Sequence, residues 1–350
     1  MAAADVPIID VGCLLPGSDS SESSRRACEA KILAAAIEVG FFYISGHGVT
    51  EEMQQQMDET SERFFALPLA EKRRIEMKHA GTDWKGYFEV GEEYTSGIID
   101  EKEGLYFSRE LPANDPRPLH GPNQWPQNPP GMRQLVLGYM DAMESIADML
   151  LRAIGSALGL PADHFAYREP TTLFRIMHYP PHDGAHGDDT FAVGEHTDYG
   201  YLTVLRQDNS GGLQIKADDG SWVDAPPVPN TFVVNLGDAL EHNTGGLLRA
   251  TPHRVQQRLG ATSGRLSFPF FYDPPWSVTM RSVEPLLSEE HHELAQRRRA
   301  TRPKRWDGKK LDLFGGEYGE YLLNKVSVVF PTLAGETDVV EAGRKGRSMY

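Results

Sequence analysis

The stretch His196-Thr-Asp-Tyr-Gly-Tyr-Leu-Thr-Val-Leu205 places two potential metal ligands next to a predicted β-strand over Tyr201–Leu205. His196 and Asp198 are two positions apart, so an extended backbone would direct both side chains to one face. Similar short runs follow Thr172 and are separated by Gly, Pro, Asn and Asp residues. Strands at this spacing predict a sandwich or barrel, of which the jelly roll is the usual ligand-holding form.

His253 is the candidate for a third ligand. It lies 253 − 196 = 57 residues after His196, so a different strand must supply it. Two imidazoles and one carboxylate with open positions are typical of non-haem iron(II) oxygenases, although zinc accepts the same ligand types. Arg265-x-Ser267 follows a short loop later, and a guanidinium fork with a hydroxyl can hold a carboxylate.

The overall composition is that of an ordinary globular protein. The chain has 350 residues, of which 40% are hydrophobic and 24% charged, enough to bury a core. The net charge of −15 argues against broad nucleic-acid binding. No apolar run is long enough to cross a bilayer and the first residues do not resemble a secretory signal, so we expect a cytoplasmic protein without a membrane partner.

Cysteines and basic residues add two smaller expectations. Cys13 and Cys28 are too few for a disulfide framework and fit a reducing compartment. The basic run Arg297–Lys310 is most simply a solvated helix end and loop, and the alternative is a nuclear-localisation or anion-binding role.

One long amphipathic helix is predicted over residues 132–158. Its apolar residues recur at steps of three and four: Tyr139, Met143, Ile146, Leu150, Ile154 and Leu158. This stripe requires a sheet or helix beneath it. We therefore divide the chain into an N-terminal segment (1–130), a core with this support helix (131–334) and a polar tail (335–350), all within one compact unit.

Residues 78–130 lack periodicity and contain scattered Gly, Pro, Trp and Tyr. A long irregular segment inside a compact domain is uncommon unless it serves a site. We therefore expect substrate contacts from this segment and from beside the His-x-Asp pair, with core packing as the alternative for each. The candidate residues are Tyr87, Glu93, Thr95, Phe107 and Tyr201.

A second cluster of potential ligands lies just before the His-x-Asp pair. Its members are His182, Asp183, His186, Asp188 and Asp189. They stand among Pro and Gly residues, so no regular element fixes their geometry. We interpret them as a solvated loop near the pocket mouth rather than as a metal site.

Several stretches carry a family resemblance and occur in the family's order. They are Phe41-Phe42, Gly46-His-Gly-Val49, His196-Thr-Asp-Tyr-Gly200, Gly211-Gly-Leu-Gln-Ile215, Asn235-Leu-Gly-Asp238, His253-Arg-Val255 and Arg265-Leu-Ser267. Through them the chain resembles the iron(II)/2-oxoglutarate-dependent dioxygenases of the isopenicillin N synthase-like family. Residues 91–97, 120–126 and 244–255 are similar to the subgroup that includes the ethylene-forming enzyme.

The resemblance implies an α+β fold: a double-stranded β-helix (jelly-roll) core flanked by helices, with an N-terminal segment of helices and strands packed on it. It implies that His196, Asp198 and His253 bind iron(II). It further implies that a small soluble organic substrate is oxidised with dioxygen, while 2-oxoglutarate is decarboxylated to succinate.

The resemblance also assigns the co-substrate site. Arg265 and Ser267 would grip the distal carboxylate of 2-oxoglutarate, and Tyr179 would lie nearby. Two alternatives stay open: a family oxidase that does not use 2-oxoglutarate, because Arg-x-Ser can hold a substrate carboxylate, and a non-catalytic sensor that binds iron and 2-oxoglutarate. A monomer is expected. The residues leave open which substrate is oxidised and whether the outcome is hydroxylation, desaturation, cyclisation or fragmentation.

Overall fold

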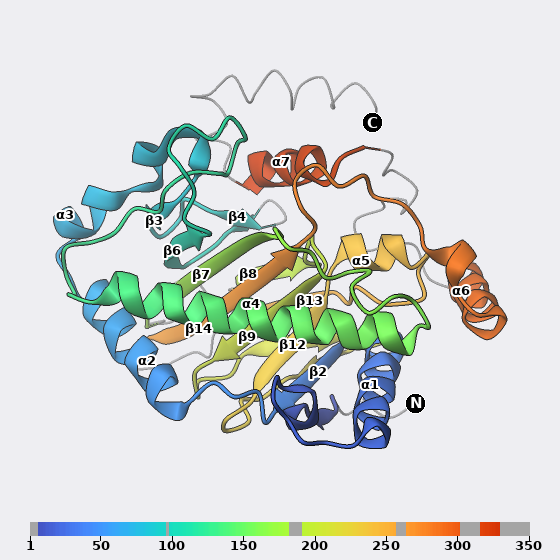
Figure 1. The fold of residues 1–350 in the computed structure, drawn as a ribbon. Helices are drawn as coiled ribbons and strands as arrows, with labels where there is room; N and C mark the ends of the chain where they lie inside the picture. Colours follow the sequence, from blue (N-terminus) through green and yellow to red (C-terminus); the bar gives the residue numbers. More distant parts are fainter. Residues whose placement is uncertain (1–5, 96–97, 182–190, 257–263, 302–315, 330–350) are drawn as a thin grey trace.

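Two β-sheets form the centre of the computed structural model, which describes residues 6–95, 98–181, 191–256, 264–301 and 316–329 (Figure 1). The eight-stranded sheet contains, in spatial order, β1 (Ile8–Asp10), β2 (Phe41–Ser45), β12 (Phe232–Leu236), β9 (Leu202–Gln207), β14 (Arg265–Asp273), β7 (Thr171–Tyr179), β6 (Glu103–Ser108) and β3 (Gly86–Phe88). The four-stranded sheet contains β11 (Trp222–Asp224), β10 (Leu213–Lys216), β13 (His253–Gln256) and β8 (Phe191–His196). A separate pair joins β4 (Tyr94–Thr95) to β5 (Ile98–Ile99).

Helix α4 (Met132–Ala157) runs across the eight-stranded sheet and confirms the predicted support helix (Figure 1). Its apolar stripe is buried, and it contacts α1 (Glu22–Glu38), α2 (Glu51–Phe65), β9 and β14. The remaining helices are η1 (Gly12–Leu14), α3 (Leu69–Lys72), η2 (Arg73–Ile75), η3 (Met77–Asp83), α5 (Asp238–Asn243), η4 (Glu284–Leu286), α6 (Glu289–Thr301) and α7 (Tyr318–Val329). Sheets flanked by helices are the α+β jelly roll that the resemblance implied.

The eight-stranded sheet has two faces of opposite character. One face, here called the helix side, packs on α4 through alternate residues such as Phe174, Ile176, Leu266, Phe268 and Phe270. The other, here called the inner face, belongs to a second cluster in which Met177 and Tyr179 pack with residues of the four-stranded sheet. Because side chains alternate along a strand, neighbouring residues in sequence face opposite sides.

The segment 78–130 is more regular than its sequence suggests, which corrects the expectation of an irregular segment. β6 pairs with β7 along its whole length, and β3 pairs with β6 at the sheet edge. The turn beyond β6 is also fixed, since the Asn123 side chain bonds both the N–H and the C=O of Ser108. Pairing with β7 supplies the order that the local sequence does not indicate.

Several sequence-based expectations fall wholly or partly outside the described residues: the His182–Asp189 cluster, the tail 335–350 and the end of the basic run beyond residue 301. Within α6, Arg298 donates hydrogen bonds to the carbonyls of Ile37 and Leu247, and Arg299 pairs with Glu284. None of the described helices has both the length and the apolar character of a membrane span.

Candidate metal and co-substrate site

The fold brings His196, Asp198 and His253 together. His196 ends β8 and His253 begins β13, and the two residues are direct partners across these strands. The Nε2 atom of each histidine lies 3.7 Å from Oδ1 of Asp198. One potential ligand atom from each residue lies within 4.8 Å of the others, so a single ion between them can contact all three.

Backbone carbonyls fix both imidazole rings. Nδ1 of His196 lies 2.8 Å from the carbonyl oxygen of Gly194, and Nδ1 of His253 lies 3.1 Å from that of Thr251. A carbonyl can only accept, so each Nδ1 carries a proton and each Nε2 is the ring nitrogen that faces Asp198. This arrangement orients metal-binding histidines in proteins generally.

The charges of the triad suit a divalent cation. Burial, together with the neighbouring His253, lowers the pKa of His196 to about 4, so its imidazole is neutral near pH 7. Burial alone would raise the pKa of Asp198, but the facing imidazoles and hydrogen bonds from Thr203 and Asn235 lower it. Two imidazole nitrogens and one carboxylate leave other coordination positions open, the pattern of the iron(II) facial triad.

Arg265 lies on the inner face at the start of β14, opposite Tyr179, and Ser267 lies opposite Met177. The Arg265 side chain is buried, and its Nε donates to the carbonyl of Gly211 at 2.8 Å. Nη1 and Nη2 are also buried, yet neither has a hydrogen-bond partner among the described residues. A buried guanidinium fork without an acceptor is a fitting place for a carboxylate.

Three of the predicted substrate contacts lie on the other side of the sheet. Tyr87, Phe107 and Tyr201 all belong to the helix-side cluster and are almost fully buried. Phe107 stacks on Trp125, with ring centroids 4.8 Å apart. The Tyr201 hydroxyl accepts a hydrogen bond from Asn243 at 2.5 Å. Strand alternation directs Tyr87 and Phe107 away from the metal ligands, whereas Tyr201 precedes β9 and is placed by its own packing in the same cluster. All three side chains therefore occupy the packed core, which was the alternative to a substrate contact.

Glu93 belongs to a buried network of charges. It pairs with Lys102 at 3.0 Å and with Arg175, and it accepts a hydrogen bond from Tyr106 at 3.1 Å. Lys102 also pairs with Asp100 at 2.5 Å. Burial alone would raise the pKa of Glu93, but the two cations outweigh it and lower that pKa to about 2. Glu93 is therefore ionised and fully paired.

This charge network lies beside the metal ligands. Thr95 lies in β4, which follows Glu93 and contacts β8, the strand that carries His196. The Lys102 charge also contributes to the lowered pKa of His196, after burial and the charges of the nearer residues. The network and the triad therefore lie within electrostatic reach of each other.

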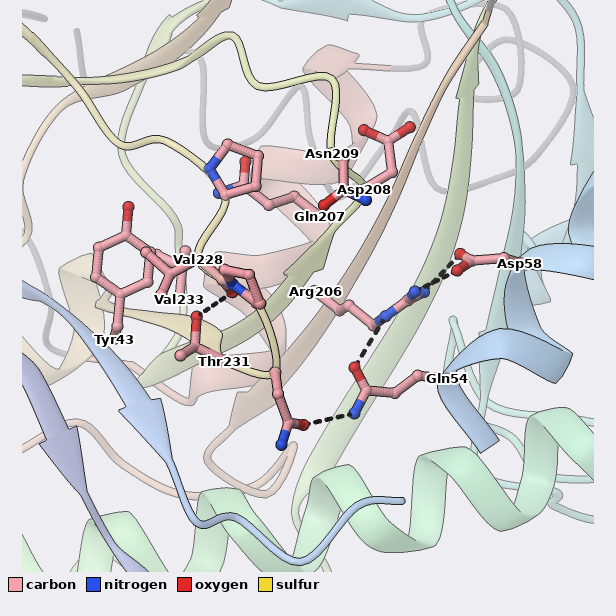
Figure 2. A pocket seen from close by; sticks show the side chains of 13 residues that line it. Tyr43, Gln54, Asp58, Arg206, Gln207, Asp208, Asn209, Val228, Thr231 and Val233 are labelled. Carbon is pink, nitrogen blue, oxygen red and sulfur yellow. Dashed lines mark hydrogen bonds and ion pairs between the residues drawn. The ribbon is translucent and has the colours of Figure 1, made fainter. Parts of the chain in front are cut away.

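A separate cavity of about 120 Å³ lies beside the end of β9 (Figure 2). Arg206 donates to the carboxylate of Asp58 and to the side-chain oxygen of Gln54 (Figure 2). Gln54 in turn donates to the side-chain oxygen of Asn230. None of the predicted site residues lines it. Because the guanidinium already has a carboxylate partner, the cavity does not offer a free cation to an anionic ligand.

Sequence reasoning missed Thr203, Asn235, Arg175 and Lys102. Asn235 lies in the Asn-Leu-Gly-Asp stretch, but nothing in that stretch indicates which residue it touches. Arg175 sits two residues before Met177, and strand alternation could have placed it on the inner face. The partners of Lys102 depend on contacts between distant segments.

Two family models match the chain. The first, described as the N-terminal region of a non-haem dioxygenase in morphine synthesis, covers residues 6–128, and the 2OG-Fe(II) oxygenase superfamily covers residues 170–274. A probable iron/ascorbate oxidoreductase from Dictyostelium discoideum is 38% identical over 94% of this chain and 95% of its own length. A homoarginine-6-hydroxylase from Glycine max is 32% identical over 94% of this chain and 98% of its own length.

Among solved structures, the chain resembles a full-length Neurospora crassa protein in complex with alpha-KG and thymine. The TM-score is 0.70 and the sequence identity 26%, over 85% of this chain and 97% of that one.

Proposed function

The chain belongs to the 2OG-Fe(II) oxygenase superfamily, and from this premise we propose which of its residues perform the reaction. The protein is an iron(II)- and 2-oxoglutarate-dependent dioxygenase that oxidises a small organic substrate and decarboxylates 2-oxoglutarate to succinate. His196, Asp198 and His253 would hold the iron, because Nε2 of both histidines and Oδ1 of the aspartate face one another. The bound iron supplies the dioxygen chemistry that amino-acid side chains lack.

The observation that carries the co-substrate assignment is the unpartnered fork of Arg265. Nη1 and Nη2 are buried without an acceptor in the described part of the chain, which is costly, and a carboxylate that accepts from both nitrogens removes that cost. Ser267 adds a hydroxyl two residues along the same face, and the ring of Tyr179 lies 4.8 Å from the guanidinium carbon. These three residues bind and orient the distal carboxylate of 2-oxoglutarate.

Anaerobic titration of the iron(II) protein with 2-oxoglutarate tests this assignment. Arg265→Gln should weaken 2-oxoglutarate binding by about 10- to 100-fold, because a charge-assisted hydrogen bond contributes roughly 1.5–3 kcal/mol. Arg265→Lys, which keeps the charge but loses the fork, should fall between Arg265→Gln and the wild type. Unchanged 2-oxoglutarate affinity in Arg265→Gln would contradict the assignment and favour the alternative that Arg265 binds a substrate carboxylate.

We further propose that the substrate is a zwitterionic amino acid. The network holds two buried anions, Glu93 and Asp100, with the buried Lys102 and the partly buried Arg175, beside the iron ligands. Opening the Glu93–Arg175 pair would present a carboxylate and a guanidinium side by side. An α-ammonium and an α-carboxylate can replace that pair without leaving a buried charge uncompensated. The homoarginine-6-hydroxylase similarity supports the same class.

Succinate release tests the substrate class. Homoarginine, arginine and other free amino acids should stimulate it, whereas N-acetylated and esterified forms of the same compounds should not. Thymine and aromatic acids serve as comparison compounds without the zwitterion. Stimulation by a compound of the second group, with none by any amino acid, would contradict the proposal. Succinate release that no compound stimulates would favour the sensor alternative.

Two further proposals concern the cellular location and the oligomeric state. We propose that the protein is cytoplasmic and works as a monomer; among the described residues both cysteines are free thiols, which supports a reducing compartment. Cell fractionation and light scattering of the purified protein test the two statements separately.

A further inference from the structure

The two carboxylate oxygens of Asp198 have different surroundings. Oδ1 faces the histidine nitrogens, as described above. Oδ2 accepts two hydrogen bonds, from the Thr203 hydroxyl at 2.5 Å and from the Asn235 side-chain amide at 2.7 Å. All three side chains are buried. Both donors therefore act on the oxygen that points away from the two imidazoles.

Thr203 and Asn235 form a cross-strand pair. They are direct partners in the antiparallel pairing of β9 with β12. Both side chains therefore project from the inner face, side by side on neighbouring strands. The backbone near Asp198 is held as well, because the N–H of Asp238 donates to the Asp198 carbonyl at 2.8 Å. These protein groups thus hold the carboxylate in its orientation.

We propose that Thr203 and Asn235 are positioning residues that hold Asp198 as a one-oxygen ligand. By occupying Oδ2, they direct Oδ1 alone to the ion. A carboxylate that bound through both oxygens would fill a second coordination position, and the triad needs its open positions for 2-oxoglutarate and dioxygen. The inference rests on the proposed role of Asp198 as an iron ligand.

Thr203→Val removes the hydroxyl at nearly constant volume, and Thr203→Ser retains it, so the two variants form a matched pair. Thr172→Val makes the same change at another buried strand threonine, whose hydroxyl has no partner among the described residues. Asn235→Leu removes the second donor. Outer-shell partners typically account for 10- to 100-fold in metal affinity, which sets the effect that we expect from each donor.

The readouts are iron(II) affinity under anaerobic conditions, the visible charge-transfer band that forms on addition of 2-oxoglutarate, and the melting temperature without metal. In Thr203→Val and Asn235→Leu, affinity should fall about 10- to 100-fold and the band should shift or weaken. Thr203→Ser should stay within about threefold of the wild type, since the donor is retained. Thr172→Val should match the wild type in affinity and band.

Two results would overturn the inference: wild-type affinity and band in Thr203→Val, or equal losses in Thr203→Val and Thr203→Ser. Asp198→Ala separates this failure from failure of the iron site itself. If Asp198→Ala retained iron, the ligand assignment would be wrong. If Asp198→Ala lost iron while Thr203→Val and Asn235→Leu kept it with an unchanged band, only the positioning role would be wrong.

Discussion

The two faces of the eight-stranded sheet place opposite demands on the same strands. On β14, Arg265 and Ser267 lie on the inner face, while Leu266 and Phe268 pack against α4 on the helix side. The helix side requires apolar volume, which several residue types can supply. The inner face requires specific donors and acceptors at specific positions. A slip of one residue in strand register would exchange the two sets, so the apolar packing also fixes the position of the chemistry.

The largest expected effect comes from removing one of the metal ligands, which adjoin the inner face. His196→Ala or Asp198→Ala should abolish iron binding and succinate release, because each removes one of three ligands. His196→Ala leaves the apolar helix side untouched, so its metal-free melting temperature should change little, whereas Asp198→Ala also removes the acceptor of two buried hydrogen bonds and should lower that temperature. Metal analysis of protein purified without oxygen, together with thermal denaturation, provides the measurement. Full iron occupancy in His196→Ala would show that the ligand assignment is wrong.

The second prediction concerns the helix side. Phe270→Ala should destabilise the protein by about 3–5 kcal/mol, because it deletes a fully buried ring from the α4 contact. The fraction that remains folded should bind iron(II) with unchanged affinity. Urea denaturation and anaerobic iron titration at low temperature measure the two quantities. A loss of iron affinity as large as that of a ligand variant would mean that the two faces are not independent.

The metal ligands and the support helix were predictable from the sequence. The spacing of His196 and Asp198 places both on one face of an extended backbone, and the structure brings His253 beside them. The support helix was predictable because its stripe is long and regular. The support helix follows from local periodicity. The grouping of His253 with His196 and Asp198 follows from motifs that occur in the order typical of the family.

The core positions of Tyr87, Phe107 and Tyr201 had no such signal in the sequence. β3 has only three residues, and Glu103-Gly-Leu-Tyr-Phe-Ser108 places bulky side chains at Tyr106 and Phe107 on opposite faces. Alternation of polar and apolar residues therefore does not reveal which face is inner. The Thr203–Asn235 contact could not be predicted for a different reason: it joins two strands that are adjacent in space but not in sequence.

Asp273 is a second carboxylate near the metal ligands, and its titration affects stability. Burial raises the pKa of Asp273 to about 7, from a usual value of 3.8, despite a hydrogen bond from Tyr318. The folded protein thus retains a proton that the unfolded chain releases, and this contribution to stability is lost as the pH rises from about 4 through 7. Asp273→Asn should remove that dependence, which amounts to about 1.4 kcal/mol per pH unit.

Urea denaturation at several pH values between 5 and 8 measures this effect. The variant should gain stability relative to the wild type as the pH rises, with the largest difference at pH 8. The Tyr318 hydroxyl can still donate to the amide oxygen, so the hydrogen bond itself is retained. A stability difference that does not vary with pH would mean that Asp273 is ionised in the folded protein across this range.

Tyr201→Phe has the smallest expected effect of these substitutions, and it tests directly on which face of the sheet Tyr201 lies. Tyr201 lies only three residues after Asp198. Its hydroxyl nevertheless accepts a hydrogen bond from Asn243 and lies 3.4 Å from the Tyr167 hydroxyl on the helix side. Tyr201→Phe should therefore cost about 1 kcal/mol of stability, the usual value of one buried hydrogen bond. Succinate release and its dependence on 2-oxoglutarate and substrate should not change. A shifted substrate dependence at unchanged stability would place Tyr201 in the pocket, and the assignment of this residue to the helix side would be wrong.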